Sequence, residues 1–177
     1  IMVVMWGALY SFGVFFKPVL NEFGWTRAVT AGAFSLNLIM SGFLGIFAGR
    51  LSDRFGPRLV VTVCGLFGGL GYLLMSQINS IWQMYLLYGV LISMGGTSIW
   101  VPLISTVARW FTKRRGLASG IVSAGIGVGT VIMPPLANQL ISSYKWRTSY
   151  AVVGLIAVVL IVILAQFLRR DPGQRSL

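Results

Sequence analysis

Long apolar runs make up most of this chain, and short turns that carry the charged residues separate them. Hydrophobic residues account for 56% of the sequence and charged residues for 10%, and the mean hydropathy is +0.85. A soluble domain would have about a quarter of its residues charged. An α-helix needs about 20 mostly apolar residues to cross a bilayer, and these runs have that length. The sequence therefore predicts an all-α integral membrane protein.

Six of the runs qualify as transmembrane helices. They span residues 1–20, 28–48, 59–76, 81–108, 116–141 and 148–168. Residues 169–177 are expected to leave the membrane as the start of a cytoplasmic linker. The chain begins with Ile1, and no charged leader precedes the first run. We therefore expect it to begin partway into its first helix and to have no cleavable signal peptide.

Basic residues outnumber acidic ones by fourteen to three, and they lie at the ends of the apolar runs. One side of the predicted membrane has ten of them: Arg50, Arg54, Arg58, Arg109, Lys113, Arg114, Arg115, Arg169, Arg170 and Arg175. The other side has four: Lys17, Arg27, Lys145 and Arg147. The positive-inside rule places the richer side, and with it both termini, in the cytoplasm, with the protein in a plasma or inner membrane. Because the bases do not follow one soluble face, they do not indicate nucleic-acid binding.

The segment Gly49–Arg58 holds three arginines, one carboxylate, two glycines and a proline. Charge at this density cannot lie in hydrocarbon, so we expect a turn at the membrane surface. Glycines let two helix ends approach closely, and Pro57 suits the first turn of the next helix. A generic basic turn would need the arginines, but it would not need Asp53.

This spacing resembles the loop between the second and third helices of major facilitator superfamily transporters, G-x-L-x-D-R-x-G-x-R. The matching residues are Gly49, Leu51, Asp53, Arg54, Gly56 and Arg58. The resemblance implies six helices that form one half of a major facilitator bundle, a 3+3 inverted repeat, and transport by alternating access. We expect a conformational switch made of Gly49, Asp53, Arg54, Gly56 and Arg58. In it, Asp53 would pair with nearby arginines and a facing helix end, and would hold the cytoplasmic gate closed in the outward-facing state.

A weak internal repeat agrees with that architecture. Aligning Gly49–Leu66 with Asn138–Leu155 pairs Arg58 with Arg147 and Gly65 with Gly154. The two turns fall on opposite sides of the predicted membrane, as inverted three-helix repeats require. Chance similarity between apolar segments is the alternative.

A second motif joins the fourth and fifth predicted helices, where a basic run gives way abruptly to small residues. Small residues make a thin helix that packs closely against its neighbours in lipid. The run of an aromatic, Phe, a Lys and two further bases before Leu-Ala resembles the monocarboxylate porter family, with the oxalate/formate antiporters next. Its marker residues here are Arg109, Lys113, Arg114 and Arg115. A tightly packed helix beside a basic loop, as in any transporter, is the alternative.

Three residues are candidates for the substrate pathway: Tyr10, Asn37 and Trp100. The resemblance places Tyr10 where the porter family can have a lysine, and a phenol can still donate a hydrogen bond to a carboxylate. An ordinary packed tyrosine is the alternative. Asn37 is costly in lipid unless it faces a cavity or a partner helix, so it can equally serve as an interhelical hydrogen bond.

No enzyme site stands out in the sequence. The three acids, Glu22, Asp53 and Asp171, lie far apart at predicted surfaces, so paired-carboxylate catalysis has no support. The chain has no histidine, which excludes a histidine metal site. We therefore expect no catalytic residue, no metal and no cofactor.

The resemblance implies a secondary active transporter of small organic anions, most simply monocarboxylates, with proton symport as one form of coupling. An oxalate/formate-type exchanger and a non-transporting truncated or scaffolding membrane module are the alternatives. The expected partners are a small organic anion, the lipid bilayer, and either a missing C-terminal six-helix half or a second copy of the chain.

Overall fold

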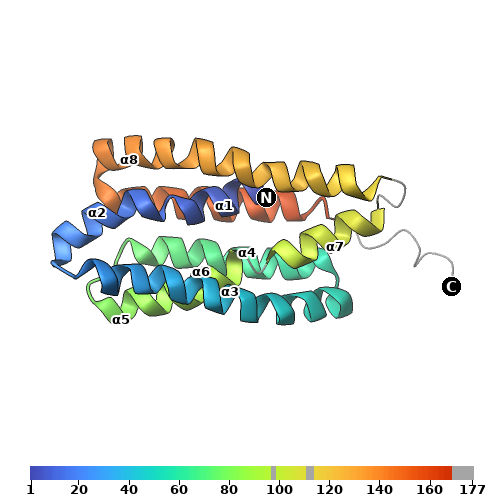
Figure 1. Ribbon diagram of the computed structural model, residues 1–177, viewed down its shortest axis with the longest axis horizontal. Helices are drawn as coiled ribbons and strands as arrows, with labels where there is room; N and C mark the ends of the chain where they lie inside the picture. The colour runs from blue at the N-terminus through green and yellow to red at the C-terminus, as the bar shows by residue number, and fades with distance from the viewer. Residues whose placement is uncertain (97–98, 111–113, 169–177) are drawn as a thin grey trace.

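The computed structural model describes residues 1–96, 99–110 and 114–168, and the regular elements within these residues are helices. The helices lie roughly along the long axis of the molecule (Figure 1). Five stretches are long and apolar enough to cross a membrane: Met2–Phe23, Arg27–Phe55, Pro57–Met75, Ile81–Ala108 and Gly116–Ala165. The described part of the chain is therefore an all-α, multi-pass membrane protein, as its composition predicts.

The last helix, α8 (Arg115–Ala165), contains two crossing segments. A straight helix of 51 residues would measure about 77 Å, whereas the hydrocarbon core of a bilayer is about 30 Å thick. Lys145 has φ 67° and ψ 158°, which lie outside the helical region, and the chain reverses near this point (Figure 1). With α8 divided at Lys145 into a first and a second arm, the structure has six crossing segments.

The first crossing consists of α1 (Met2–Tyr10) and α2 (Phe12–Phe23), which meet at Ser11. The Ser11 hydroxyl donates a hydrogen bond of 2.8 Å to the Gly7 carbonyl of the preceding turn. Gly24, with φ 65°, ends α2, so this crossing continues three residues beyond the predicted end at residue 20.

The prediction of a surface turn at Gly49–Arg58 is wrong for most of that segment. Helix α3 (Arg27–Phe55) continues through it, and α4 (Pro57–Met75) begins two residues later. Gly56, with φ 93°, makes the turn, and its amide donates a hydrogen bond of 2.9 Å to the Ser52 carbonyl. Arginine and serine are compatible with a helix, so the charged residues extend α3 beyond its apolar part.

The fourth crossing is interrupted, although the sequence predicts one continuous helix. It consists of α5 (Ile81–Met84), the π-helix η1 (Tyr85–Leu91), α6 (Ile92–Gly95) and α7 (Trp100–Trp110). The interruption follows Gly95, which lies against Gly68 of α4 so closely that a Cβ built on Gly68 would be 2.6 Å from the Gly95 Cα. Glycine allows this close packing, but it also weakens the helix at that point.

Helix α4 and the second arm of α8 pack closely and show the inverted repeat in space. The aligned glycines Gly65 and Gly154 both lie at this contact, and a Cβ on Gly154 would be 2.7 Å from the Leu73 amide nitrogen. At one end of the pair, Arg58 at the start of α4 donates a hydrogen bond to Gln166 at the end of α8. At the other end, Arg147 at the start of the second arm donates to the Ser76 carbonyl, just after α4, over 3.1 Å. Each helix thus begins with an arginine that binds the end of its partner.

Candidate functional site

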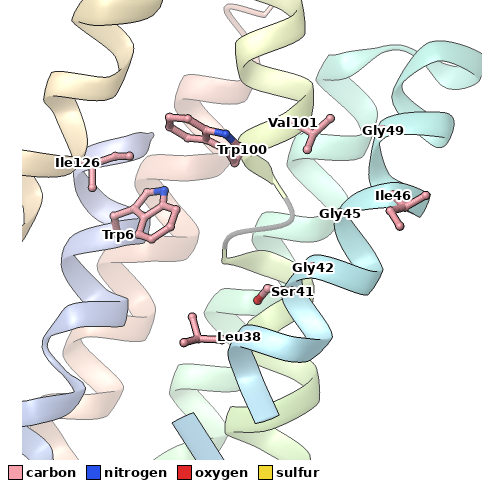
Figure 2. A pocket seen from close by; sticks show the side chains of 10 residues that line it. All are labelled: Trp6, Leu38, Ser41, Gly42, Gly45, Ile46, Gly49, Trp100, Val101 and Ile126. Atoms are coloured by element: carbon pink, nitrogen blue, oxygen red, sulfur yellow. The ribbon is translucent and has the colours of Figure 1, made fainter. Parts of the chain in front are cut away.

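A groove opens between α1, α3, α7 and the first arm of α8 (Figure 2). It has a volume of about 620 Å³, which is in the range of pockets that hold small organic molecules. Its wall is mostly apolar, and the lining residues are Trp6, Leu38, Ser41, Gly42, Gly45, Ile46, Gly49, Trp100, Val101 and Ile126.

Aromatic rings form one side of the groove. The Trp6 and Trp100 rings meet edge to face, with their centroids 6.2 Å apart, and both point into the space between α1 and α7 (Figure 2). Tyr10 stacks on Trp6 at 5.9 Å, and its side chain is 48% exposed. Of the sequence candidates, Trp100 lines the groove, whereas Tyr10 contacts Trp6 but is not among the lining residues. Trp6 shares a face of the first helix with Tyr10, and this periodicity is the signal that points to it.

Glycines leave the α3 side of the groove without bulky side chains. A Cβ on Gly49 would lie 3.2 Å from Cγ1 of Val101, whereas one on Gly42 would meet open space. Gly49 is also the first residue of the matched motif, so this motif begins in the groove wall. The sequence carries no signal for that placement, because it depends on how α3 packs against α7.

Ser41 is the polar side chain in the groove lining. The residue is 5% exposed, and its hydroxyl oxygen is buried without a hydrogen-bond partner. Trp6 and Trp100 are half-buried, and their indole nitrogens are not among the buried polar atoms that lack a hydrogen-bond partner. Asn37 Oδ1 and the Tyr150 hydroxyl, which lie outside the groove lining, are likewise buried without a partner.

Asn37 lies outside the groove lining. It is 1% exposed, and its side-chain amide donates a hydrogen bond of 2.7 Å to the Tyr88 carbonyl in η1. The wider turn of a π-helix displaces carbonyls from their usual intrahelical partners, and Asn37 supplies a replacement donor here. The structure thus places Asn37 at the contact between α3 and η1, where it serves as an interhelical hydrogen bond.

The residues of the expected switch lie between the groove and one end of the bundle. Asp53 and Arg54 occupy the last turn of α3 with exposed side chains, and both have interaction partners. The Arg54 guanidinium lies 5.4 Å from the centroid of the Phe55 ring. Arg58 lies beyond the Gly56 turn and binds Gln166.

The basic family-marker residues lie close in sequence to the start of α8. Arg109 lies in α7, Arg114 precedes α8 with an exposed side chain, and Arg115 is the first residue of α8. Lys113 lies outside the described residues. The helix that follows packs closely as expected, since a Cβ on Gly7 of α1 would lie 2.8 Å from the Gly129 carbonyl oxygen.

A polar cluster that the sequence does not predict lies at the opposite end of the bundle. Arg147 donates two hydrogen bonds to Glu22 Oε1, at 2.8 Å from Nη2 and 3.1 Å from Nε. The Trp146 indole donates to Glu22 Oε2. The repeat alignment, which pairs Arg147 with Arg58, was the available signal. Within the described residues, no group of three His, Cys, Asp or Glu side chains could hold a metal ion.

Within the described residues, six crossing segments with a groove along one side form the arrangement expected for one half of a membrane carrier. The sequence model of the Major Facilitator Superfamily matches residues 1–177, and the chain belongs to this superfamily.

Individual relatives have names that describe transporters rather than enzymes. Monocarboxylate transporter 13 of Rattus norvegicus is 31% identical over 158 residues, which are 89% of this chain and 37% of that protein. Monocarboxylate transporter 4 of the same species is 35% identical over 85% of this chain and 33% of its own length. The oxalate:formate antiporter of Oxalobacter formigenes is 30% identical over 99% of this chain and 42% of its own length. The chain thus spans between 33% and 42% of the length of these three relatives.

Proposed function

We propose that the chain is part of a secondary active carrier that moves small organic anions, monocarboxylates above all, by alternating access. The observation that carries this proposal is the groove, whose mostly apolar wall contains the indole side chains of Trp6 and Trp100 and has no acidic residue among its lining residues. Such a wall suits an anion with a short hydrocarbon part. Similarity to monocarboxylate transporters and to an oxalate:formate antiporter supports the same substrate class.

A second six-helix unit completes the carrier in this proposal, either a C-terminal half or a second copy of the chain. The groove is open on one side, and Ile46, which lines it from α3, is 59% exposed. A facing unit would cover this side and turn the groove into an enclosed site.

The orientation in this proposal puts both termini in the cytoplasm of a plasma or inner membrane. The end of the bundle that contains Arg58 is then cytoplasmic, because it has the larger share of basic residues. Asp53, Arg54 and the Gly56 turn form a cytoplasmic latch, and Arg58 ties that latch to the end of α8 through Gln166.

The test is uptake of radiolabelled lactate, pyruvate and oxalate by the full-length carrier in proteoliposomes, with and without a pH gradient. We expect saturable uptake of lactate or pyruvate. Stimulation by an inwardly directed proton gradient would identify symport, whereas oxalate uptake that requires formate inside would identify the exchanger. If none of the three anions is taken up, the proposal is overturned in favour of a non-transporting module.

A further inference from the structure

Two buried polar atoms of α3 have no hydrogen-bond partner among the described residues. They are the side-chain oxygens of Asn37 and Ser41, residues that are 1% and 5% exposed. The two residues are four positions apart, and side chains at this spacing are neighbours on one face of a helix. An unpaired polar atom in the interior of a membrane protein is costly, so a ligand bound between the two oxygens would remove both costs.

The hydrogen bond of Asn37 fixes the orientation of its side-chain amide. The amide nitrogen donates to the Tyr88 carbonyl over 2.7 Å, and a carbonyl can only accept a hydrogen bond. The reverse orientation would place two acceptor oxygens against each other. Asn37 Oδ1 is therefore an acceptor that still needs a donor or a cation, and it lies beside the fourth crossing.

Ser41 lies level with the interruption of the fourth crossing. On one side of it along α3, Asn37 contacts Tyr88 before the interruption. On the other side, a Cβ on Gly45 would lie 3.9 Å from Val101 Cγ2, after the interruption. These three α3 residues follow one another at four-residue spacing and share a face. Ser41 thus faces the part of the fourth crossing where α6 gives way to α7 (Figure 2).

The end of α6 supplies further acceptor oxygens at this level. The helical run that starts at Ile81 ends at Gly95, and the last carbonyls of a helix have no intrahelical donors. This end also carries the negative pole of the helix dipole. Helix α3 packs against α6, so the two unpaired side-chain oxygens lie near that negative end. In secondary transporters, the C-terminal ends of interrupted helices coordinate sodium ions or protons.

The chemistry of these oxygens favours a sodium ion. Amide, hydroxyl and backbone carbonyl groups do not titrate near neutral pH, so they cannot hold a proton in place of an ion. Divalent ions usually take carboxylate ligands, and within the part of the chain that the structure describes no group of three His, Cys, Asp or Glu side chains could hold a metal.

We propose that Asn37 Oδ1, Ser41 Oγ and the C-terminal end of α6 form a binding site for a sodium ion. The ion ties α3 to the interrupted fourth crossing. The site lies behind the groove wall, because Ser41 lines the groove while its hydroxyl oxygen is buried. This inference goes beyond the function proposed above and does not depend on which anion the carrier transports.

The test is thermal unfolding of the purified full-length carrier in sodium chloride and in choline chloride at equal concentrations. A ligand that binds only the folded protein raises Tm as its concentration rises. We expect Tm to rise saturably with sodium chloride but not with choline chloride. Ser41→Ala removes one ligand and leaves the bond between Asn37 and Tyr88, so it should weaken the apparent sodium affinity about tenfold.

The matched control is Ser35→Ala. It removes a hydroxyl from the same helix, but this hydroxyl already donates to the Ala31 carbonyl. The control variant should keep the full effect of sodium on Tm. In choline chloride, Ser41→Ala should unfold at or above the wild-type Tm, because it removes an unpaired buried hydroxyl. A lost sodium effect in this variant is then not a sign of misfolding.

Two results would overturn the site. If the wild-type Tm is the same in both salts, the two oxygens are simply unpaired. If Ser41→Ala keeps the wild-type sodium effect, the ion binds elsewhere. Uptake of lactate and pyruvate is a separate measurement: a sodium effect on Tm without uptake leaves the site standing and removes the proposed function, and uptake without a sodium effect does the reverse.

Discussion

Gly56 and Lys145 adopt the same backbone conformation at opposite ends of the bundle. Gly56 has φ 93° and ψ 151°, and Lys145 has φ 67° and ψ 158°. Gly56 joins α3 to α4, and Lys145 joins the two arms of α8. The sequence alignment of the two repeats pairs Gly56 with Lys145. The corresponding chain reversals therefore have a glycine in one repeat and a lysine in the other.

Lys145→Gly should therefore stabilise the protein. A positive φ combined with an extended ψ is a region that only glycine occupies without strain, and other residues lose about 1–3 kcal/mol there. We expect a gain of about 1 kcal/mol, since glycine also makes the unfolded chain more flexible. Thermal unfolding in detergent measures the change, and Lys145→Ala is the control because it keeps a Cβ. An equal rise in Tm for both variants would mean that backbone strain is not the cause.

Arg147→Lys should destabilise the end of the bundle that contains Glu22. The guanidinium makes two hydrogen bonds to Glu22 and lies 4.7 Å from the centroid of the Trp146 ring, and a lysine cannot reproduce this geometry. Because the pair is partly exposed, we expect a loss of only about 1 kcal/mol. The measurement is thermal unfolding with Arg27→Lys as the control. A double-mutant cycle with Glu22→Gln should show coupling, and strictly additive effects would contradict the pairing.

Gly68→Ala should be strongly destabilising. A Cβ at this position would lie 2.6 Å from the Gly95 Cα, and a backbone atom cannot move aside as a flexible side chain can. We expect a loss of about 1–3 kcal/mol or more from overpacking. Gly13→Ala is the matched control, because nothing lies within 4 Å of its added Cβ, and it should stabilise α2 by up to about 1 kcal/mol. Equal Tm values for the two variants would argue against the close contact between α4 and α6.

Asp53→Asn should release the proposed cytoplasmic latch. Without the carboxylate, we expect the full-length carrier to shift toward the inward-facing state and to lose at least fivefold in uptake, as a conformational coupling of about 1 kcal/mol would produce. Cysteine-accessibility labelling at the two ends reports the ratio of states, and Glu22→Gln at the opposite end is the control. Wild-type uptake with an unchanged ratio would rule the latch out.

Hydropathy and spacing were enough to predict the general architecture, because both are local properties of the chain. Lipid offers no hydrogen-bond partners, so the backbone N–H and C=O groups of each crossing segment must pair within the protein. A single long apolar run achieves this by forming a helix. The motif around Asp53 indicated the family because it too is a local pattern of residues. The alignment of Arg58 with Arg147 pointed to two arginines that each bind the end of a neighbouring helix in the structure.

The interruption at Gly95, the continuation of α3 to Phe55 and the composition of the groove were decided by tertiary contacts. Asn37 and Ser41 are both polar residues in one apolar helix, yet one binds the Tyr88 carbonyl and the other lines the groove. Their sequence surroundings do not distinguish them, because the difference lies in which helix each residue faces. The packing of α3 against η1 and α7 therefore determines which of the two residues binds a neighbouring helix and which lies at the groove.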